Sequence, residues 1–176
     1  MKDKVALVTG GSKGMGEAAV RIFAEKGASV AILDVDIEAA EKLSTELNEN
    51  GANTIAIQCD VSSEAQVEKA IAKVVETYGK LDAAFNNAGI QIPAQDITET
   101  SEEDYDKILN VNLKGVWLCM KHELIQMKKQ QSGARTPPPQ TGHSEARAEQ
   151  YELRPRRYWR RQPTVPRHSP STDQVQ

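Results

Sequence analysis

A glycine-rich turn close to the N-terminus constrains the fold of this chain more than any other feature. The turn spans Thr9 to Gly16 (TGGSKGMG), follows the apolar run Val5–Val8 and opens the helical stretch 17–26. A buried strand that leads through such a turn into a helix leaves backbone N–H groups free around one point, where they can bind an anion. We therefore predict a phosphate-binding turn between a strand and a helix.

Three glycines of this turn have separate expected roles. Gly10 can take a positive φ, Gly14 lets the backbone approach a pyrophosphate closely, and Gly16 lets the helix sit against the strand. A loop that merely needs glycine is the competing interpretation, but the strand before it and the helix after it favour ligand binding. The contacts expected from the turn come from Thr9, Gly10, Ser12, Lys13, Gly14, Met15 and Gly16.

A carboxylate follows at the spacing that is typical of dinucleotide-binding folds. The stretch Ala28–Leu33 reads as a second strand, and Asp34 stands at its end, where a ribose-binding acid is expected. Asp34 can accept hydrogen bonds from a free ribose 2′-hydroxyl but repels a 2′-phosphate, which favours NAD(H) over NADP(H). Lys13 argues in the opposite direction, because a cation there could meet that phosphate. We expect Asp34 to dominate through its closer hydrogen bonds.

The apolar periodicity alternates between strands and helices along the chain. Further strands are expected at 54–57 and 81–85, and further helices at 37–48, 63–79 and 100–129. This alternation predicts a Rossmann-like, doubly wound α/β fold with an incomplete parallel sheet of about four strands in the order 3-2-1-4.

Local patterns predict how three of the helices begin and pack. Ser63-x-x-Gln66 and Thr100-x-x-Glu103 have the spacing of capping boxes. The first helix carries an apolar stripe that should face the sheet, made of Met15, Ala19, Ile22 and Phe23.

Polar residues follow the third and fourth strands, at the same edge of the sheet as Asp34. Asp60-Val61 comes after the third strand, and Asn86-Asn87-Ala88-Gly89 comes after the fourth. Open α/β sheets bind ligands at the carboxyl ends of their strands, although Asp, Asn and Gly are also ordinary turn residues. The cofactor contacts expected from this edge are Asp60, Val61, Asn87, Ala88 and Gly89.

Three motifs, in this order along the chain, resemble those of the short-chain dehydrogenase/reductase family. They are Thr9-Gly10-x-x-x-Gly14-x-Gly16, Asn86-Asn87-Ala88-Gly89 and Asn110-Val111-Asn112-Leu113, and the resemblance covers about residues 3–134. It implies hydride transfer between a nicotinamide cofactor and an alcohol or carbonyl substrate.

The resemblance also implies roles for particular residues. Asp60 would contact the adenine ring, and Asn112 would be the catalytic Asn, which holds a proton-relaying water. From the residues alone, Asn112 can equally be a polar side chain that is satisfied within its own helix. The helix at 101–129 would pack against a partner subunit, so that a homo-oligomer is expected.

The family pattern breaks off after residue 134. It requires a fifth apolar strand with a catalytic Ser and then Tyr-x-x-x-Lys, but residues 135–176 contain no Lys, no Ile and no run of four β-forming residues. Seven of the eight Pro lie in 132–176, so we expect a folded domain at 1–131 and a disordered tail at 132–176. A shifted reading frame would produce such a change, and reading the gene in its other frames tests that hypothesis.

Composition limits the function further. Residues 1–131 carry 14 Lys and Arg against 21 Asp and Glu, whereas 132–176 carry eight Arg against four acids. The stretch 154–161 could bind nucleic acid, but an Arg-rich octamer is weak support and we expect a solvated tail. Cys59 and Cys119 are solitary, so we expect reduced thiols and no metal site. Without a leader or a membrane-length apolar run, the chain is expected to be cytoplasmic.

Two functions remain open from the sequence alone. One is an NAD-dependent oxidoreductase of the resembled family, acting on a small alcohol or carbonyl substrate. The other is a non-catalytic nucleotide-binding fragment with a basic tail. Because the Ser, Tyr and Lys set is absent from the sequence, we expect no turnover at a rate typical of the family.

Overall fold

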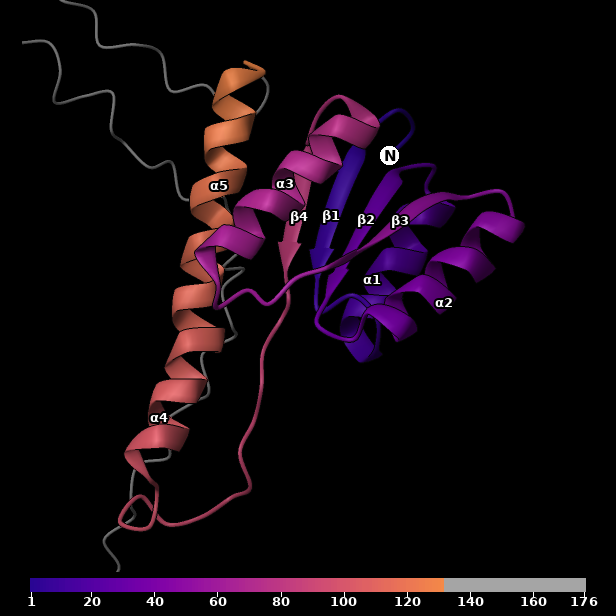
Figure 1. Ribbon diagram of the computed structural model, residues 1–176. Helices are drawn as coiled ribbons and strands as arrows, with labels where there is room; N and C mark the ends of the chain where they lie inside the picture. The colour runs from indigo at the N-terminus through magenta and orange to yellow at the C-terminus, as the bar shows by residue number, and fades with distance from the viewer. Residues whose placement is uncertain (132–176) are drawn as a thin grey trace, which may run out of the picture. The chain divides into compact units, whose positions relative to one another are not determined.

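The computed structural model describes residues 1–131, which form a parallel sheet with helices on both faces (Figure 1). The sheet has the order β3-β2-β1-β4, as expected from the sequence. Its strands are β1 (Val5–Thr9), β2 (Ser29–Asp34), β3 (Asn53–Gln58) and β4 (Ala83–Asn86). The helices are α1 (Gly14–Glu25), α2 (Ile37–Glu49), α3 (Glu64–Tyr78), α4 (Glu102–Leu109), the π-helical η1 (Asn110–Gly115) and α5 (Val116–Lys129). The expected Rossmann-like fold is confirmed, whereas the expectation of a disordered tail concerns residues outside the described ones.

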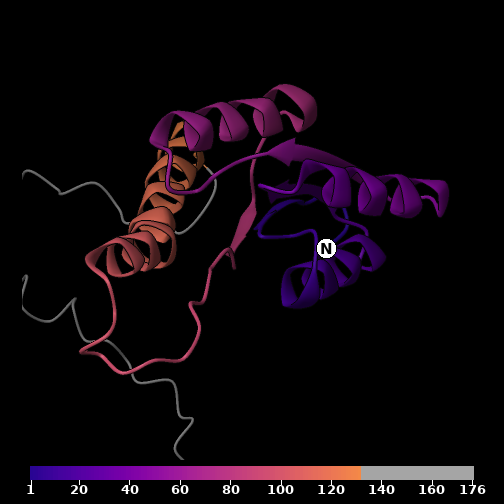
Figure 2. The same ribbon diagram turned by 60° about the horizontal axis from the view of Figure 1, so that its bottom comes forward.

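Each face of the sheet has its own apolar core. Alternate residues of β1 point to opposite faces, with Val5 and Leu7 in one core and Ala6 and Val8 in the other. The first core is closed by α3 and α5, and the second is closed by α1 and α2. Figure 2 shows α3 and the α1–α2 pair on opposite sides of the sheet. With both faces covered, all five residues of β1 are buried.

The first helix packs on the sheet through a stripe one residue away from the expected one. Met15 and Ile22 are 80% and 54% exposed, whereas Gly16 and Val20 are buried; of the expected stripe, Phe23 does pack against the core. The stripe keeps its helical period but starts at Gly16, because this glycine lets the helix pack against Gly10 and Asn87. The pattern of apolar side chains missed the shift, since glycine has no side chain to mark a buried position.

Both expected capping boxes are wrong. Ser63 precedes α3 but makes no side-chain capping bond, and Gln66 Oε1 instead accepts the N–H of Asp60 at 2.9 Å. The N-cap of α4 is Ser101 and not Thr100, since the Ser101 hydroxyl accepts the N–H of Asp104 at 3.1 Å. In both places a neighbouring loop offers a competing hydrogen bond that the local spacing does not reveal.

The long C-terminal helix contains an irregular turn where the sequence has weak helix formers. Asn110 to Gly115 form the π-helical segment η1, which joins α4 to α5. Gly115 is buried there, and a Cβ on it would lie 2.7 Å from Cγ2 of Val61. Short π-helical segments are rare and occur most often at functional sites. This one places Asn112 beside the loop that follows β4.

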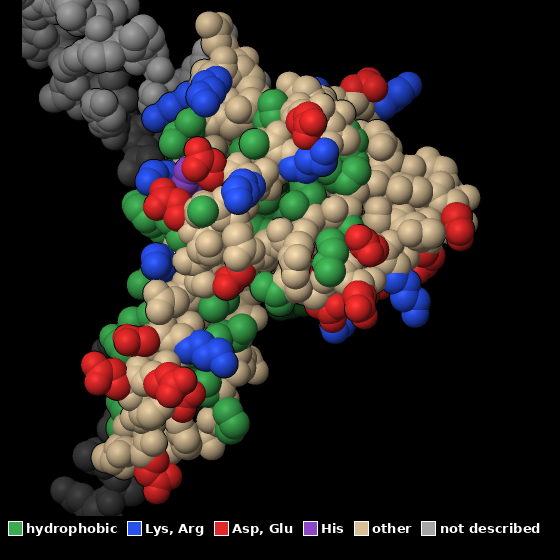
Figure 3. All heavy atoms as spheres, viewed as in Figure 1, with side chains coloured by type: hydrophobic (Ala, Val, Ile, Leu, Met, Phe, Trp, Pro, Cys, Tyr) green, Lys and Arg blue, Asp and Glu red, His purple; other side chains and the backbone are tan. Residues whose placement is uncertain are grey.

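One side of the long helix and one edge of the sheet lack partners among the described residues. Within residues 1–131, β4 pairs with β1 alone. Figure 3 shows apolar side chains along the column formed by α4, η1 and α5. Its exposed apolar residues are Tyr105, Leu113, Trp117, Met120, Leu124 and Ile125. In the part of the chain that is described, no helix is long and apolar enough to cross a membrane.

Candidate functional site

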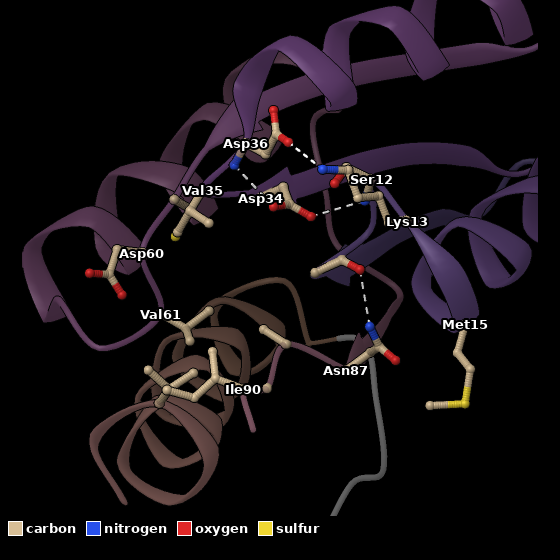
Figure 4. Close-up of a pocket in the computed structure, with 15 residues that line it drawn as sticks. Ser12, Lys13, Met15, Asp34, Val35, Asp36, Asp60, Val61, Asn87 and Ile90 are labelled. Carbon is tan, nitrogen blue, oxygen red and sulfur yellow. Dashed lines mark hydrogen bonds and ion pairs between the residues drawn. The ribbon is translucent and has the colours of Figure 1, made fainter. Parts of the chain in front are cut away.

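A cavity of about 600 Å³ lies at the carboxyl ends of the strands. The glycine-rich turn, the loops after β2 and β3, and the loop after β4 each contribute to its wall (Figure 4). Ten of the expected site residues line it: Gly10, Ser12, Lys13, Met15, Asp34, Asp60, Val61, Asn87, Ala88 and Gly89. The parallel sheet thus brings together segments that are far apart in the sequence, as the ligand-binding edge of an open α/β sheet does.

The turn is shaped by two glycines that leave no room for a side chain. Gly10 has φ +61°, and a Cβ on it would lie 2.9 Å from Cα of Ala88. A Cβ on Gly16 would lie 2.7 Å from Nδ2 of Asn87 and would overlap the carbonyl group of Gly10. Both glycines therefore allow the turn and the start of α1 to pack closely against the loop after β4.

Thr9 and Asn87 fix this contact through hydrogen bonds. The buried hydroxyl of Thr9 accepts the backbone N–H groups of Asn87 and Ala88, each at 3.0 Å. In return, Nδ2 of Asn87 donates to the carbonyl oxygens of Thr9 and Gly10, at 3.2 and 3.0 Å. Thr9 does not line the cavity and instead positions the residues that do.

Asp34 ties the glycine-rich turn to the loop after β2. One carboxylate oxygen accepts the N–H of Ser12, and the other accepts the N–H of Asp36, both at 3.0 Å. Each carboxylate oxygen can accept a further hydrogen bond, so Asp34 keeps capacity for a ligand hydroxyl. The Asp34 side chain is half-buried, which restricts its position, and it still lines the cavity, where a ligand can reach it.

A surface ion pair borders the same part of the cavity. Nζ of Lys13 lies 2.6 Å from Oδ2 of Asp36, and both residues line the cavity (Figure 4). The hydrogen bond and charge of Asp36 raise the pKa of Lys13, and the same contact lowers the pKa of Asp36. Asp36 was not expected at the site from the sequence. Its signal is a second acid close behind Asp34, at the N-cap of α2.

Asp60 is held by its own loop at the end of β3. Its backbone N–H donates to Gln66, and Oδ1 accepts both the N–H and the hydroxyl of Ser62, at 2.9 and 2.7 Å. Cys59 beside it also lines the cavity, and burial raises the pKa of its thiol to about 11. A thiol with that pKa stays protonated at neutral pH and is a poor nucleophile.

Asn112 holds the loop after β4 with its whole side-chain amide. Oδ1 accepts the N–H of Ile90 at 2.8 Å, and Nδ2 donates to the carbonyl oxygen of Ile90 at 2.9 Å. Asn112 itself does not line the cavity, although Ile90 and Val111 do. The side chain is therefore satisfied by the loop after β4 and not within its own helix, and it holds one wall of the cavity in place.

A buried acid lies directly behind this wall. Glu123 of α5 is 4% exposed, and its Oε2 accepts Nδ2 of Asn86 at 3.0 Å. The other oxygens of the two groups, Oε1 of Glu123 and Oδ1 of Asn86, are buried and have no hydrogen-bond partner within residues 1–131. Burial raises the pKa of Glu123, and a proton on Oε1 would supply the donor that Asn86 lacks. Burial and the unsatisfied amide oxygen of Asn86 therefore both favour the protonated form of Glu123.

Among the expected site residues, four do not line the cavity: Thr9, Gly14, Gly16 and Asn112. Sequence reasoning missed five that do: Val35, Asp36, Cys59, Ile90 and Val111. The three apolar residues in this group carry no chemical signal and are marked only by their places next to strand ends or in η1. Gly14 has φ +57° at the start of α1, which the sequence did not indicate.

Comparisons with known proteins agree with this geometry. Residues 4–134 match the family described as short chain dehydrogenase. The chain is 40% identical over 134 residues to secoisolariciresinol dehydrogenase of Forsythia intermedia, covering 76% of this chain and 48% of that protein. It is 45% identical over 130 residues to an uncharacterized oxidoreductase of Thermotoga maritima, covering 74% and 51%. The crystal structure of gox2181 matches with a TM-score of 0.74 and 30% identity, covering 76% of this chain and 52% of the other.

The chain spans about half the length of the curated relatives that it matches. The match ends close to residue 134, where the motifs of the sequence also end, and it includes every described helix and strand. The fold agrees with that of the matched family. The chain belongs to the short chain dehydrogenase family.

Proposed function

We propose that residues 1–131 form a domain that binds NAD(H) in the cavity at the carboxyl ends of the strands. Membership of the family implies an NAD(P) cofactor in general terms. The observation that carries the proposal is one cavity lined by the glycine-rich turn, by Asp34 and by the loop 87–89. A dinucleotide needs the turn for its phosphates, an acid such as Asp34 for its adenosine ribose, and a loop such as 87–89 beside its nicotinamide half.

The residues present fit such a ligand. Lys13 is the N-cap of α1 but makes no side-chain capping hydrogen bond, so the first N–H groups of the helix are not capped by that side chain. A Cβ on Gly14 would meet no heavy atom within 4 Å, which leaves the approach to these N–H groups open. An uncapped helix start is a favourable site for a pyrophosphate.

The remaining contacts follow from the order of the strands. Asp34 is positioned to accept a ribose 2′-hydroxyl, and Asp60 with Val61 would border the adenine ring. The loop 87–89 would border the other half of the cofactor. The free 2′-hydroxyl of NAD(H) suits Asp34 better than a 2′-phosphate does, because a carboxylate repels a second anion.

The bound nicotinamide would supply the hydride acceptor or donor for an alcohol or carbonyl carbon. A proton must also leave or reach the substrate oxygen, and a positioned acid/base group contributes roughly 10²–10⁴-fold to that step. Among the described residues no Tyr lines the cavity, and Lys13 is the lysine in its wall. The sequence has no Tyr followed four residues later by Lys. We therefore propose that this chain binds the cofactor but does not turn over substrate at the family's rate.

Asn112 has a structural role that explains its presence without catalysis. Its amide holds both backbone groups of Ile90 and thereby shapes the cavity wall. The proton relay implied by the family resemblance would have no Tyr or Lys to serve in this chain. We propose that Asn112 acts here as a positioning residue.

The cofactor proposal is tested by titrating NADH and NADPH into the protein and following binding by calorimetry. We expect saturable binding of one NADH per chain and weaker binding of NADPH. Asp34→Asn should weaken NADH binding, because the amide loses the charge that strengthens the ribose hydrogen bonds. Glu41→Gln, which neutralises an acid of α2 outside the cavity wall, serves as the matched control. Absence of NADH binding, or tighter binding of NADPH, would refute the proposal.

The inactivity proposal is tested with a chimera. Residues after 134 would be replaced by the corresponding half of the Thermotoga maritima relative, and nicotinamide absorbance would be followed with a panel of secondary alcohols. We expect turnover from the chimera and none at a comparable rate from the chain itself. Equal rates would mean that an acid/base group has been overlooked.

We also propose that the domain self-associates through the exposed apolar side of α4, η1 and α5. Leu113 and Trp117 are 65% and 57% exposed on that side. Leu113→Lys should lower the apparent mass in sedimentation velocity, because it places a charge in the buried centre of the contact. A monodisperse monomer that melts in one sharp transition would contradict this proposal.

A further inference from the structure

Three charged side chains meet at the wall of the cavity beside the glycine-rich turn. Asp34 and Asp36 supply two carboxylates, and Lys13 supplies one ammonium group, all three lining the cavity (Figure 4). Nζ of Lys13 lies 2.6 Å from Oδ2 of Asp36. Asp34 also attracts the Lys13 cation, but more weakly than Asp36 does, because only Asp36 is bonded to Lys13 directly. Lys13 therefore forms its ion pair with Asp36, the acid that was not expected at the site from the sequence.

Two hydrogen bonds other than the one to Lys13 hold Asp36 in place. Its N–H donates to Oδ1 of Asp34 at 3.0 Å, and its own Oδ1 accepts the N–H of Ala39 at 3.1 Å as the N-cap of α2. Only Oδ2 is directed to Lys13. The Asp36 carboxylate is thus held by its own loop, and the longer side chain of Lys13 reaches it.

This arrangement changes what Lys13 can do for a ligand phosphate. Together the three side chains carry two negative charges and one positive charge, so the site around the ribose is anionic. A 2′-phosphate that displaced Asp36 from Lys13 would leave a fixed carboxylate unpaired beside a new anion. The cation of Lys13 within the turn therefore does not make the site favourable for NADP(H).

We propose that Asp36 is a second specificity residue, which withholds Lys13 from the 2′-phosphate and so keeps the site selective for NAD(H). The inference rests on the proposed cofactor binding and extends it to a residue that the family motifs do not include. The side chains of Lys13 and Asp36 are 72% and 40% exposed. Since exposed pairs are weak, the effect on selectivity should be modest in size.

The variant that tests the proposal is Asp36→Asn. Asn is also a good N-cap, so the start of α2 is retained while the charge is removed. We expect the ratio of the NADPH to the NADH dissociation constant to fall by about fivefold. The gain should shrink at higher salt, for example between about 0.05 M and about 0.5 M, because exposed charges are screened.

A double-mutant cycle shows whether Lys13 carries the effect. In a Lys13→Gln background, Asp36→Asn should lower the ratio by less, since no cation remains to be released and only the direct repulsion between Asp36 and the 2′-phosphate is lost. Glu49→Gln removes an exposed acid from the far end of α2 and should not change the ratio.

The outcomes separate this inference from the proposed function. If the unmodified chain binds neither NADH nor NADPH, the proposed function is refuted. If it binds NADH but Asp36→Asn does not lower the ratio, this inference alone is refuted. It is also refuted if Asp36→Asn lowers the ratio equally in the presence and in the absence of Lys13.

Discussion

Gly16→Ala tests the packing that joins the glycine-rich turn to the fourth strand. A Cβ on Gly16 would lie 2.7 Å from Nδ2 of Asn87 and 2.8 Å from the carbonyl carbon of Gly10. Real Cβ atoms do not reach such distances, so α1 or the turn must move. The affected amide also donates to the carbonyl oxygens of Thr9 and Gly10, and the movement should break both hydrogen bonds.

The expected destabilisation follows from these contacts. Two lost hydrogen bonds contribute about 1 kcal/mol each. Forcing an extra methyl group into a closely packed place adds about 1–3 kcal/mol. We expect the free energy of unfolding to fall by about 3–5 kcal/mol, a large share of the roughly 5–15 kcal/mol that is usual for a domain.

The measurement is urea unfolding, followed by far-UV circular dichroism and analysed by linear extrapolation. Gly51→Ala is the matched control, because Gly51 has φ +85° but its Cβ would meet no heavy atom within 4 Å. It should cost only the conformational strain of about 1–2 kcal/mol. If Gly16→Ala destabilises the domain no more than Gly51→Ala does, the close contact between Gly16 and Asn87 does not contribute to the free energy of unfolding.

Two further predictions concern the polar side chains behind the cavity. Burial raises the pKa of Glu123 above its ordinary 4.5, so between 4.5 and the folded pKa the folded state binds more protons than the unfolded state, and stability should fall as pH rises through this range. Glu123→Gln should remove this component from the pH dependence of the urea midpoint, and an unchanged dependence would mean that another group is responsible. Asn112→Ala should speed hydrogen exchange at the Ile90 amide by about tenfold or more, because its acceptor is lost; unchanged exchange would contradict this role of Asn112.

Much of the fold could be predicted because it depends on local patterns. The apolar runs, the turn and the polar strand ends were enough for the order β3-β2-β1-β4 and for most of the cavity wall. The predictions of the capping box at α3 and of the buried face of α1 were wrong because a segment outside the helix contacts these residues. Gln66 bonds to Asp60 instead of capping α3, and Gly16 moves the buried stripe of α1 by one residue.

The sequence by itself determined the strands, the turn and the acids at the strand ends, since each follows from neighbouring residues. The tertiary structure alone decided which side chains meet. Thr9 bonds to Asn87 across 78 positions, Asn86 to Glu123 across 37, and Lys13 to Asp36 across 23. The first and third pairs arise because parallel strands end at one edge of the sheet, whatever their separation along the chain, and the second arises because α5 packs beside β4. No local spacing encodes them, and they set the shape and the charge of the cavity.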